Sequence, residues 1–142
     1  MGIFLSIGLL AVLPNLALTP GAVRTTDKAA ICSTRTGTVR NVSVATRKKV
    51  FAAYGVRWER RAQFETDHLV SLEIGGSNVV ANLWPQPYAG IGAHSKDILE
   101  NKLHAMICRG EISPSEAQKE IASDWYKAYK RYVKKADGKL GR

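Results

Sequence analysis

Two stretches with apolar residues at helical spacing fill the second half of the chain. The first runs from about His94 to Cys108 and is ended by Gly110. The second runs from Pro114 to about Lys135, and Ser113 precedes it as a suitable N-cap. The inward-facing residues of the two stripes are Ile98, Leu99, Leu103, Met106, Ile107, Ala117, Ile121, Trp125, Ala128 and Tyr132. We therefore predict two long helices that pack through these stripes.

The first half of the chain follows a different pattern. Residues 24–41 show no helical period and are rich in Thr, Ser, Gly and Arg, so we expect an irregular or extended arm. Ser43 is a suitable N-cap for a helix over residues 44–54, which Gly55 would end. Val50, Phe51 and Tyr54 would face inward, whereas Arg47, Lys48 and Lys49 would stay in water.

Between these parts, residues 64–74 predict a strand or ribbon, followed by a tight Gly75-Gly76 turn. Residues 77–87 predict a loop, because Pro85 and Pro87 exclude a regular helix or a central strand. The order of elements is helix, ribbon, loop, helix, helix. The sequence thus indicates an α+β fold with little sheet, built as a single domain over residues 23–142.

The first 22 residues carry no charged side chain. Their apolar run, Ile3 to Leu13, is shorter than the roughly 20 residues needed to span a bilayer and suits a secretory signal peptide. A membrane anchor and a misplaced start codon are the alternatives. We expect a leader over residues 1–22, a secreted or periplasmic mature protein, and no stable membrane association once the leader is removed.

The chain has two cysteines, Cys32 and Cys108. In an exported protein the simplest outcome is one disulfide that ties the early arm to the middle of the domain. The alternative is a pair of buried thiols. A Cys-x-x-Cys pair is absent, which excludes a cysteine zinc knuckle.

The charge of the chain is strongly positive, with 21 Lys and Arg against 12 Asp and Glu, a net charge of +9. Such a surface favours a polyanion, either nucleic acid or an anionic membrane, although it can serve solubility alone. Residues placed to contact phosphate include Arg57, Arg60, Arg61 and Lys96, with the Lys-rich end of the last helix. Because the sequence shows no base-reading module, we expect little sequence specificity and a monomer that binds DNA or RNA.

One stretch combines residue types suited to phosphodiester cleavage. Asp67-His68 is followed by the Gly75-Gly76 turn, then by Asn82-Leu83 and a helix that carries His94. This arrangement resembles the HNH (His-Me finger) endonucleases. Further likeness to small exported HNH-like nucleases lies in Ile31-Cys32, Trp84-Pro85, Lys96-Asp97, Glu100 and Trp125.

The resemblance implies a ββα-metal core of ribbon plus helix, flanked by an N-terminal helix and a long C-terminal helix. It implies a metal-dependent endonuclease that hydrolyses DNA, or RNA, with His68 as general base. Asp67 and His94 would hold one divalent ion, with Mg²⁺ or Mn²⁺ most suitable and Zn²⁺ or Ni²⁺ also acceptable to these ligands. Asn82 would pin the loop against the ribbon and orient the imidazole.

Three features depart from the family pattern. His94 lies twelve residues after Asn82, a longer gap than the motif has, and Ser71 stands where many relatives have Pro. In addition, neighbours on a regular strand point to opposite faces. Asp67 and His68 can therefore serve one site only if the ribbon is twisted or bulged there.

Other readings of the same residues stay open. Asp97, Glu100 and His104 share one helical face and would form ion pairs, with the two carboxylates as reserve ligands. Trp84 and Trp125 fit a core better than a base-stacking role. At the level of function, one rival is a catalytically silent nucleic-acid-binding module on the same scaffold. The other is a secreted basic effector that acts on membranes or proteins.

Overall fold

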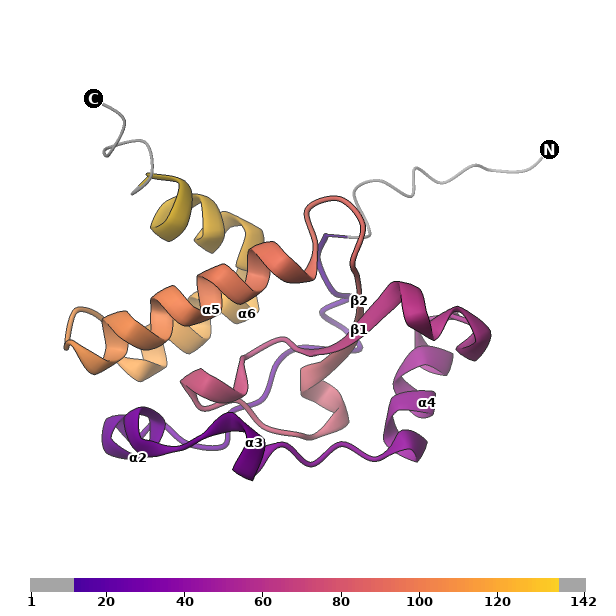
Figure 1. Cartoon of the computed structure of the whole chain (residues 1–142), viewed down its shortest axis with the longest axis horizontal. Helices are drawn as coiled ribbons and strands as arrows, with labels where there is room; N and C mark the ends of the chain where they lie inside the picture. Colours follow the sequence, from indigo (N-terminus) through magenta and orange to yellow (C-terminus); the bar gives the residue numbers. More distant parts are fainter. Residues whose placement is uncertain (1–11, 136–142) are drawn as a thin grey trace.

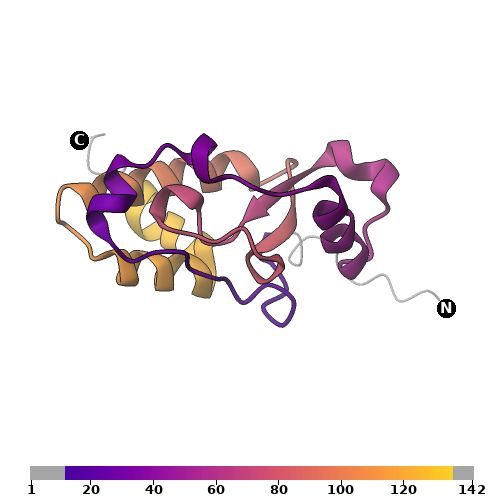
Figure 2. The same cartoon turned by 90° about the horizontal axis from the view of Figure 1, so that it is seen from below.

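The computed structural model describes residues 12–135, which form an α+β arrangement with one two-stranded antiparallel sheet (Figure 1). In chain order the elements are α2 (Lys28–Ser33), α3 (Thr36–Val39), α4 (Val44–Ala53), the 3-10 helix η1 (Trp58–Gln63), β1 (Phe64–His68), the 3-10 helices η2 (Leu72–Ile74) and η3 (Val80–Asn82), β2 (Leu83–Pro87), α5 (Ala93–Cys108), α6 (Pro114–Tyr129) and the π turn η4 (Lys130–Lys134). Helices α5 and α6 lie side by side on one side of the hairpin, and α4 lies on the other. The view from below shows the same division (Figure 2).

Strand β1 ends sooner than the sequence predicted. We expected a ribbon over residues 64–74, but the strand stops at His68 and the chain turns away into η2. Gly75 closes that turn with φ +97°. A Cβ at Gly76 would lie 1.7 Å from the carbonyl oxygen of Val70, so only glycine lets the loop close this tightly.

Strand β2 contains Pro85 and Pro87, which led us to predict a loop over residues 77–87. That prediction is wrong for the second half of the segment, because β2 pairs along the whole of β1. The two prolines are two positions apart, so their missing N–H groups face the same side of the strand. The N–H of Tyr88, the residue directly after Pro87, points the other way and donates to the carbonyl of Gln63, just before β1, at 3.1 Å. The N–H positions of Pro85 and Pro87 therefore face away from β1.

Both predicted N-caps are present. At the start of α4 the side chain of Ser43 accepts the N–H of Thr46 at 3.1 Å. At the start of α6 the side chain of Ser113 accepts the N–H of Glu116 at 3.1 Å, and Pro114 takes the first helical position. These bonds satisfy backbone donors that the first turn of a helix leaves free, which is why the two helices begin where the sequence indicated.

The main core lies between α5, α6, α2 and the loop that follows β1, and Trp84 is its member from β2. Leu99, Leu103 and Ile107 of α5 are fully buried, as predicted. We also placed Ile98 in this stripe, and that is wrong because it is 51% exposed. The buried row of α5 begins instead with Lys96 and continues with Leu99. Ile98 lies about 100° around the helix from Leu99 and therefore faces solvent.

The segment predicted as an irregular arm, residues 24–41, contains the short helices α2 and α3. Asp27 caps α2 by accepting a backbone N–H of its first turn, and Ile31 anchors the helix in the core at 1% exposure. The predicted disulfide between Cys32 and Cys108 is present. It ties α2 to the C-terminal end of α5 and so fixes the arm along one side of the molecule.

Residues 12–22 pack against the domain, although we assigned them to the end of a leader. The indole N–H of Trp125 donates to the carbonyl of Val12 at 2.7 Å. The hydroxyl of Thr19, which is completely buried, donates to a backbone carbonyl of β2 at 3.0 Å. This part of the predicted leader therefore belongs to the fold, and the rest of it, residues 1–11, lies outside the described residues.

At the other end, α6 continues into η4, so helical structure extends close to the predicted end near Lys135. Residues 137–142, for which we predicted a frayed tail, lie outside the described part of the chain. Within residues 12–135, no helix has both the length and the apolar character needed to cross a membrane.

Candidate active site

His68 lies at the end of β1 beside an open pocket of about 300 Å³. Alternate residues of a strand face the same side, and Phe64, Thr66 and His68 line this pocket together. The remaining lining residues are Arg40, Val42, Arg47, Glu65 and Tyr88. His68 is only 4% exposed, so the pocket reaches a small part of its surface.

A side-chain amide fixes the ring of His68. Oδ1 of Asn78 lies 3.0 Å from Nε2 of His68 and also accepts the N–H of Asn41 at 3.1 Å. Nδ2 of Asn78 donates to the carbonyl of Val39 at 2.7 Å, so the orientation of the amide is set from both ends. Because the amide oxygen can only accept, the hydrogen of the neutral imidazole sits on Nε2 and Nδ1 carries the lone pair.

The environment keeps this imidazole neutral near pH 7. Burial lowers the pKa of His68, and the positive charges of Arg40 and Lys96 lower it further. The hydrogen bond to the amide oxygen of Asn78 and the charge of Asp67 oppose this shift without cancelling it. A neutral imidazole with a free lone pair is the form that can take a proton from a nucleophile.

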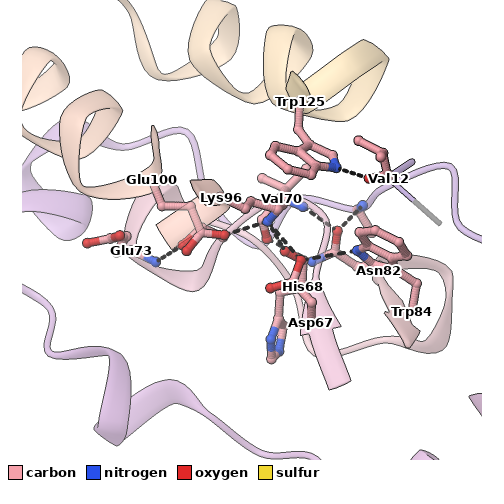
Figure 3. A network of polar contacts seen from close by, with 12 residues as sticks. Val12, Asp67, His68, Val70, Glu73, Asn82, Trp84, Lys96, Glu100 and Trp125 are labelled. Carbon is pink, nitrogen blue, oxygen red and sulfur yellow. Dashed lines mark hydrogen bonds and ion pairs between the residues drawn. The ribbon is translucent and has the colours of Figure 1, made fainter. Parts of the chain in front are cut away.

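Asp67 precedes His68, but its side chain points to the other side of β1. Its Oδ2 accepts the indole N–H of Trp84 at 3.1 Å and the ammonium of Lys96 at 2.8 Å. Figure 3 shows the carboxylate inside this network, while the imidazole of His68 points away from it. Every residue of β1 pairs with β2 in register, so the strand lacks the bulge that a shared pocket for Asp67 and His68 would require.

Lys96 is completely buried at the centre of that network (Figure 3). Its ammonium donates to Asp67, to the backbone carbonyl of His68 at 2.8 Å, and to Glu100 one turn further along α5. Burial alone would lower the pKa of Lys96, but the two carboxylates outweigh burial and raise it. Burial also raises the pKa of Glu100. We predicted that Lys96 contacts phosphate, and that is wrong because its ammonium has no exposed surface.

Asn82 is buried and joins three segments through four hydrogen bonds. Its Oδ1 accepts the N–H of Val70 at 2.9 Å and that of Ala22 at 3.2 Å. Its Nδ2 donates to the carbonyls of Val70 at 2.9 Å and Ser77 at 2.7 Å. Asn82 thus pins the loop after β1 against the hairpin, as we expected. The ring of His68 is oriented by a different amide, that of Asn78.

His94, the second expected metal ligand, lies in the first turn of α5 and is exposed. Its ring lies 6.3 Å from that of Tyr88, between centroids. The residue of α5 that reaches Asp67 is Lys96 instead. Within residues 12–135, no three or more His, Cys, Asp or Glu side chains gather in a group able to hold a metal ion.

The divalent ion that the resemblance implies therefore does not fit the pair Asp67 and His94. The carboxylate is already paired with the ammonium of Lys96, and the imidazole is on the surface. On the side of His68, the pocket is lined by two arginines and by one carboxylate, Glu65, a balance that repels a divalent cation. We assign no catalytic step to a bound ion, and the choice among Mg²⁺, Mn²⁺, Zn²⁺ and Ni²⁺ stays a prediction.

Basic and aromatic side chains of α4 and η1 extend from one wall of the pocket. The Nε of Arg47 donates to the hydroxyl of Thr66 at 3.1 Å, and its guanidinium lies 5.4 Å from the ring centroid of Trp58. Arg61 and Lys48 lie against the same ring, at 5.2 and 5.6 Å. This basic ridge, formed by Arg47, Lys48, Trp58 and Arg61, leads from the His68 pocket along the surface.

The three arginines predicted to contact phosphate, Arg57, Arg60 and Arg61, are all exposed and lie at or within η1. Arg60 lies over the ring of Phe64 at 5.7 Å, and Arg57 makes a long ion pair of 4.0 Å with an exposed glutamate. Their charges are therefore available to a polyanion that lies along the basic ridge.

Sequence reasoning missed two residues of the site: Arg40, which lines the pocket, and Asn78, which holds the ring of His68. Arg40 follows α3 in the segment predicted as irregular, where no periodicity assigned it to a face. Asn78 follows the Gly75-Gly76 turn, and a loop amide at that place is a weak signal by itself. Both meet His68 only because the arm crosses the loop after β1, and no local pattern in the sequence encodes that crossing.

Comparison of the chain with protein-family models, with curated proteins and with solved structures gave no match. The role of the pocket therefore has to be inferred from its own residues.

Proposed function

We propose that this chain is an endonuclease of low sequence specificity that cleaves phosphodiester bonds of nucleic acids, with His68 as general base. One observation carries the proposal. Asn78 holds the neutral imidazole with the lone pair of Nδ1 free, beside a pocket that Arg40 and Arg47 also line. A base and two fixed cations around one cavity suit attack on a phosphate diester.

Each group has a separate task in this reaction. Nδ1 of His68 takes the proton of the attacking water or hydroxyl as its oxygen bonds to phosphorus. The bond from phosphorus to the leaving oxygen breaks, that oxygen takes a proton from water, and the imidazolium returns its proton to the hydroxide that remains. The guanidinium groups of Arg40 and Arg47 offset the negative charge that develops on the phosphate oxygens. Asn82 and Lys96 act at a distance from the phosphate, since they hold the backbone of the loop and of His68 in place. The succession of hairpin and α5 also agrees with the ββα core of the resemblance.

The surface around the pocket supports a nucleic-acid substrate. The chain has a net charge of +9, and the basic ridge leads away from His68. Arginine contacts to phosphate are indifferent to base sequence and weaken as salt rises. Aromatic rings such as that of Trp58 add a surface on which exposed bases stack.

The test is a cleavage assay with the full, disulfide-bonded chain on plasmid DNA and on single-stranded RNA, with divalent ions and with a chelator. His68→Ala should lower the rate by about 10²- to 10⁴-fold, because the proton of the nucleophile then has no acceptor. His104→Ala is the matched control, since His104 contacts the backbone of α2 and lies outside the pocket. Equal activity of the two variants would remove His68 from the mechanism, and circular dichroism checks that both fold.

A second candidate function is a catalytically silent nucleic-acid-binding module. The observation in its favour is the low accessibility of His68 together with the pairing of Asp67 by Lys96. A gel-shift assay separates the two candidates. Binding of the wild-type chain without cleavage under any metal condition would favour the silent module and reject the endonuclease.

A further inference from the structure

We propose that the substrate is RNA, cut by attack of its own 2′-hydroxyl without a divalent ion, and that the ammonium of Lys96 permanently fills the cation position beside Asp67. This inference rests on the proposed function, because it specifies which nucleic acid the His68 pocket accepts. Two independent features carry it. They are the coordination of Lys96 and the balance of charge around His68.

The ammonium of Lys96 occupies the place where a hard cation would bind Asp67. Its three partners are a carboxylate oxygen of Asp67, the carbonyl oxygen of His68 and a carboxylate oxygen of Glu100. Carboxylate and carbonyl oxygens are the ligands that Mg²⁺ and Mn²⁺ take in proteins. A divalent ion could enter only by displacing the ammonium, which would leave a buried charge without partners and is strongly unfavourable.

The pocket on the other side of β1 is also unsuited to a divalent cation. Arg40 and Arg47 line it against the single carboxylate of Glu65. Arg40 and His68 line the same pocket, so the positive charge of Arg40 acts on the ring and contributes to lowering its pKa. The pocket therefore attracts a phosphate group and repels a metal ion.

A metal-free pocket of this kind suits RNA and not DNA. Hydrolysis of DNA needs an external water as nucleophile, and a divalent ion usually generates that nucleophile and stabilises the leaving oxygen. RNA carries its nucleophile beside each phosphorus, and well-oriented intramolecular reactions reach effective concentrations of about 10⁵–10⁸ M. One neutral base and two fixed cations are then sufficient. The 2′-hydroxyl is also the group by which a site distinguishes RNA from DNA.

The proposed cleavage is an intramolecular transesterification. Nδ1 of His68 takes the proton of the 2′-hydroxyl, O2′ forms a bond to phosphorus, and the bond from phosphorus to O5′ breaks. Arg40 and Arg47 hold the two non-bridging oxygens. The 5′ oxygen takes a proton from water, and the hydroxide that remains takes the proton from the imidazolium. The products are a 2′,3′-cyclic phosphate and a 5′-hydroxyl, and no group is oxidised or reduced.

The experiment uses the full, disulfide-bonded chain and three end-labelled single strands of one sequence: RNA, DNA, and DNA with one ribonucleotide in the middle. Each is incubated with EDTA, with Mg²⁺ or with Mn²⁺, and the ends are identified by mass spectrometry. RNA should be cut at the same rate in EDTA and in Mg²⁺. The chimera should be cut only after its ribonucleotide, with a cyclic phosphate as product, and DNA should stay intact.

The outcomes separate this inference from the proposed function. Cleavage of DNA that needs a metal and disappears in His68→Ala would overturn the inference and keep the endonuclease. RNA cleavage that leaves a 5′-phosphate would also overturn it, because water would then be the nucleophile. Absence of cleavage of any strand would overturn both proposals.

Two further measurements address the cations directly. Electron paramagnetic resonance of Mn²⁺ with the wild-type chain should show only the free ion, and Mn²⁺ binding that Asp67→Asn abolishes would overturn the role of Lys96. Arg47→Ala should slow RNA cleavage by about tenfold or more. Lys49→Ala removes an exposed charge from the same helix, outside the pocket, and is the matched control. Equal rates for these two variants would reject the pocket as the place of reaction.

Discussion

Asn82→Ala should destabilise the protein strongly, although the substitution removes only one small side-chain amide. The side chain is completely buried and makes four hydrogen bonds. Two of them satisfy the N–H and the C=O of Val70, which is itself 1% exposed. Alanine would leave these two backbone groups buried without partners and would leave a small cavity between the loop and the hairpin.

The magnitude follows from that geometry. An unsatisfied buried donor or acceptor costs about 1–3 kcal/mol, so the two groups of Val70 together account for roughly 2–6 kcal/mol. The bonds to Ala22 and Ser77 lie nearer the surface, where water can replace the amide at a smaller loss. We expect the free energy of unfolding to fall by about 3–5 kcal/mol, a large share of the 5–15 kcal/mol typical of a domain.

Urea denaturation of the oxidised chain, followed by tryptophan fluorescence, measures this loss. Asn41→Ala is the matched control, because the exposed side-chain amide of Asn41 makes no hydrogen bond within residues 12–135 and its replacement should change the free energy by less than about 0.5 kcal/mol. A loss below about 1 kcal/mol in Asn82→Ala would refute the view that this amide is the anchor of the loop. Asn82→Asp should also be destabilising, because a carboxylate cannot donate to the two carbonyls that Nδ2 now contacts.

Four other predictions concern the disulfide, the buried charges, the pKa of His68 and salt. Replacing Cys32 and Cys108 by Ser should lower the free energy of unfolding by roughly 4 kcal/mol on the chain-entropy relation, because the disulfide spans 76 residues. Denaturation of the double variant measures this loss, and an unchanged free energy would show that the arm is held in place without the disulfide. Lys96→Met should cost about 3–5 kcal/mol because it leaves buried carboxylates without their cation, and a thermal shift close to zero would contradict the network. The titration of the His68 ring by NMR should have its midpoint below the ordinary 6.5. Because the unfolded chain binds this proton at a higher pH than the folded chain, the free energy of unfolding should fall as pH falls from about 6.5 to the folded pKa of His68. The variant His68→Gln should lack this part of the pH dependence. Arg47→Ala should reduce the slope of log affinity for nucleic acid against log salt by about one, whereas an unchanged slope would place the phosphates elsewhere.

Features that depend on neighbouring residues could be predicted from the sequence. The caps at Ser43 and Ser113 and the buried row of Leu99, Leu103 and Ile107 are local patterns, and the structure contains all of them. The disulfide followed from a count of two cysteines and an expected export.

The site was predicted less completely because it depends on crossings of distant segments. A lysine in an amphipathic helix normally faces water, so nothing in the sequence indicated that Lys96 lies on the buried row of α5. Its place follows from Asp67 and Glu100, which only the packed hairpin and helix bring together. Similarly, Asn78 could be assigned to His68 only after α3 was known to cover the loop.

The hairpin has a further consequence for how the molecule meets other chains. A two-stranded sheet has two edges, and an exposed edge can pair with a strand of another chain. On the outer edge of β2, Pro85 and Pro87 have no N–H groups to donate to the carbonyls of such a strand. The same residues that concealed this strand from sequence inspection thus protect the domain against intermolecular sheet growth.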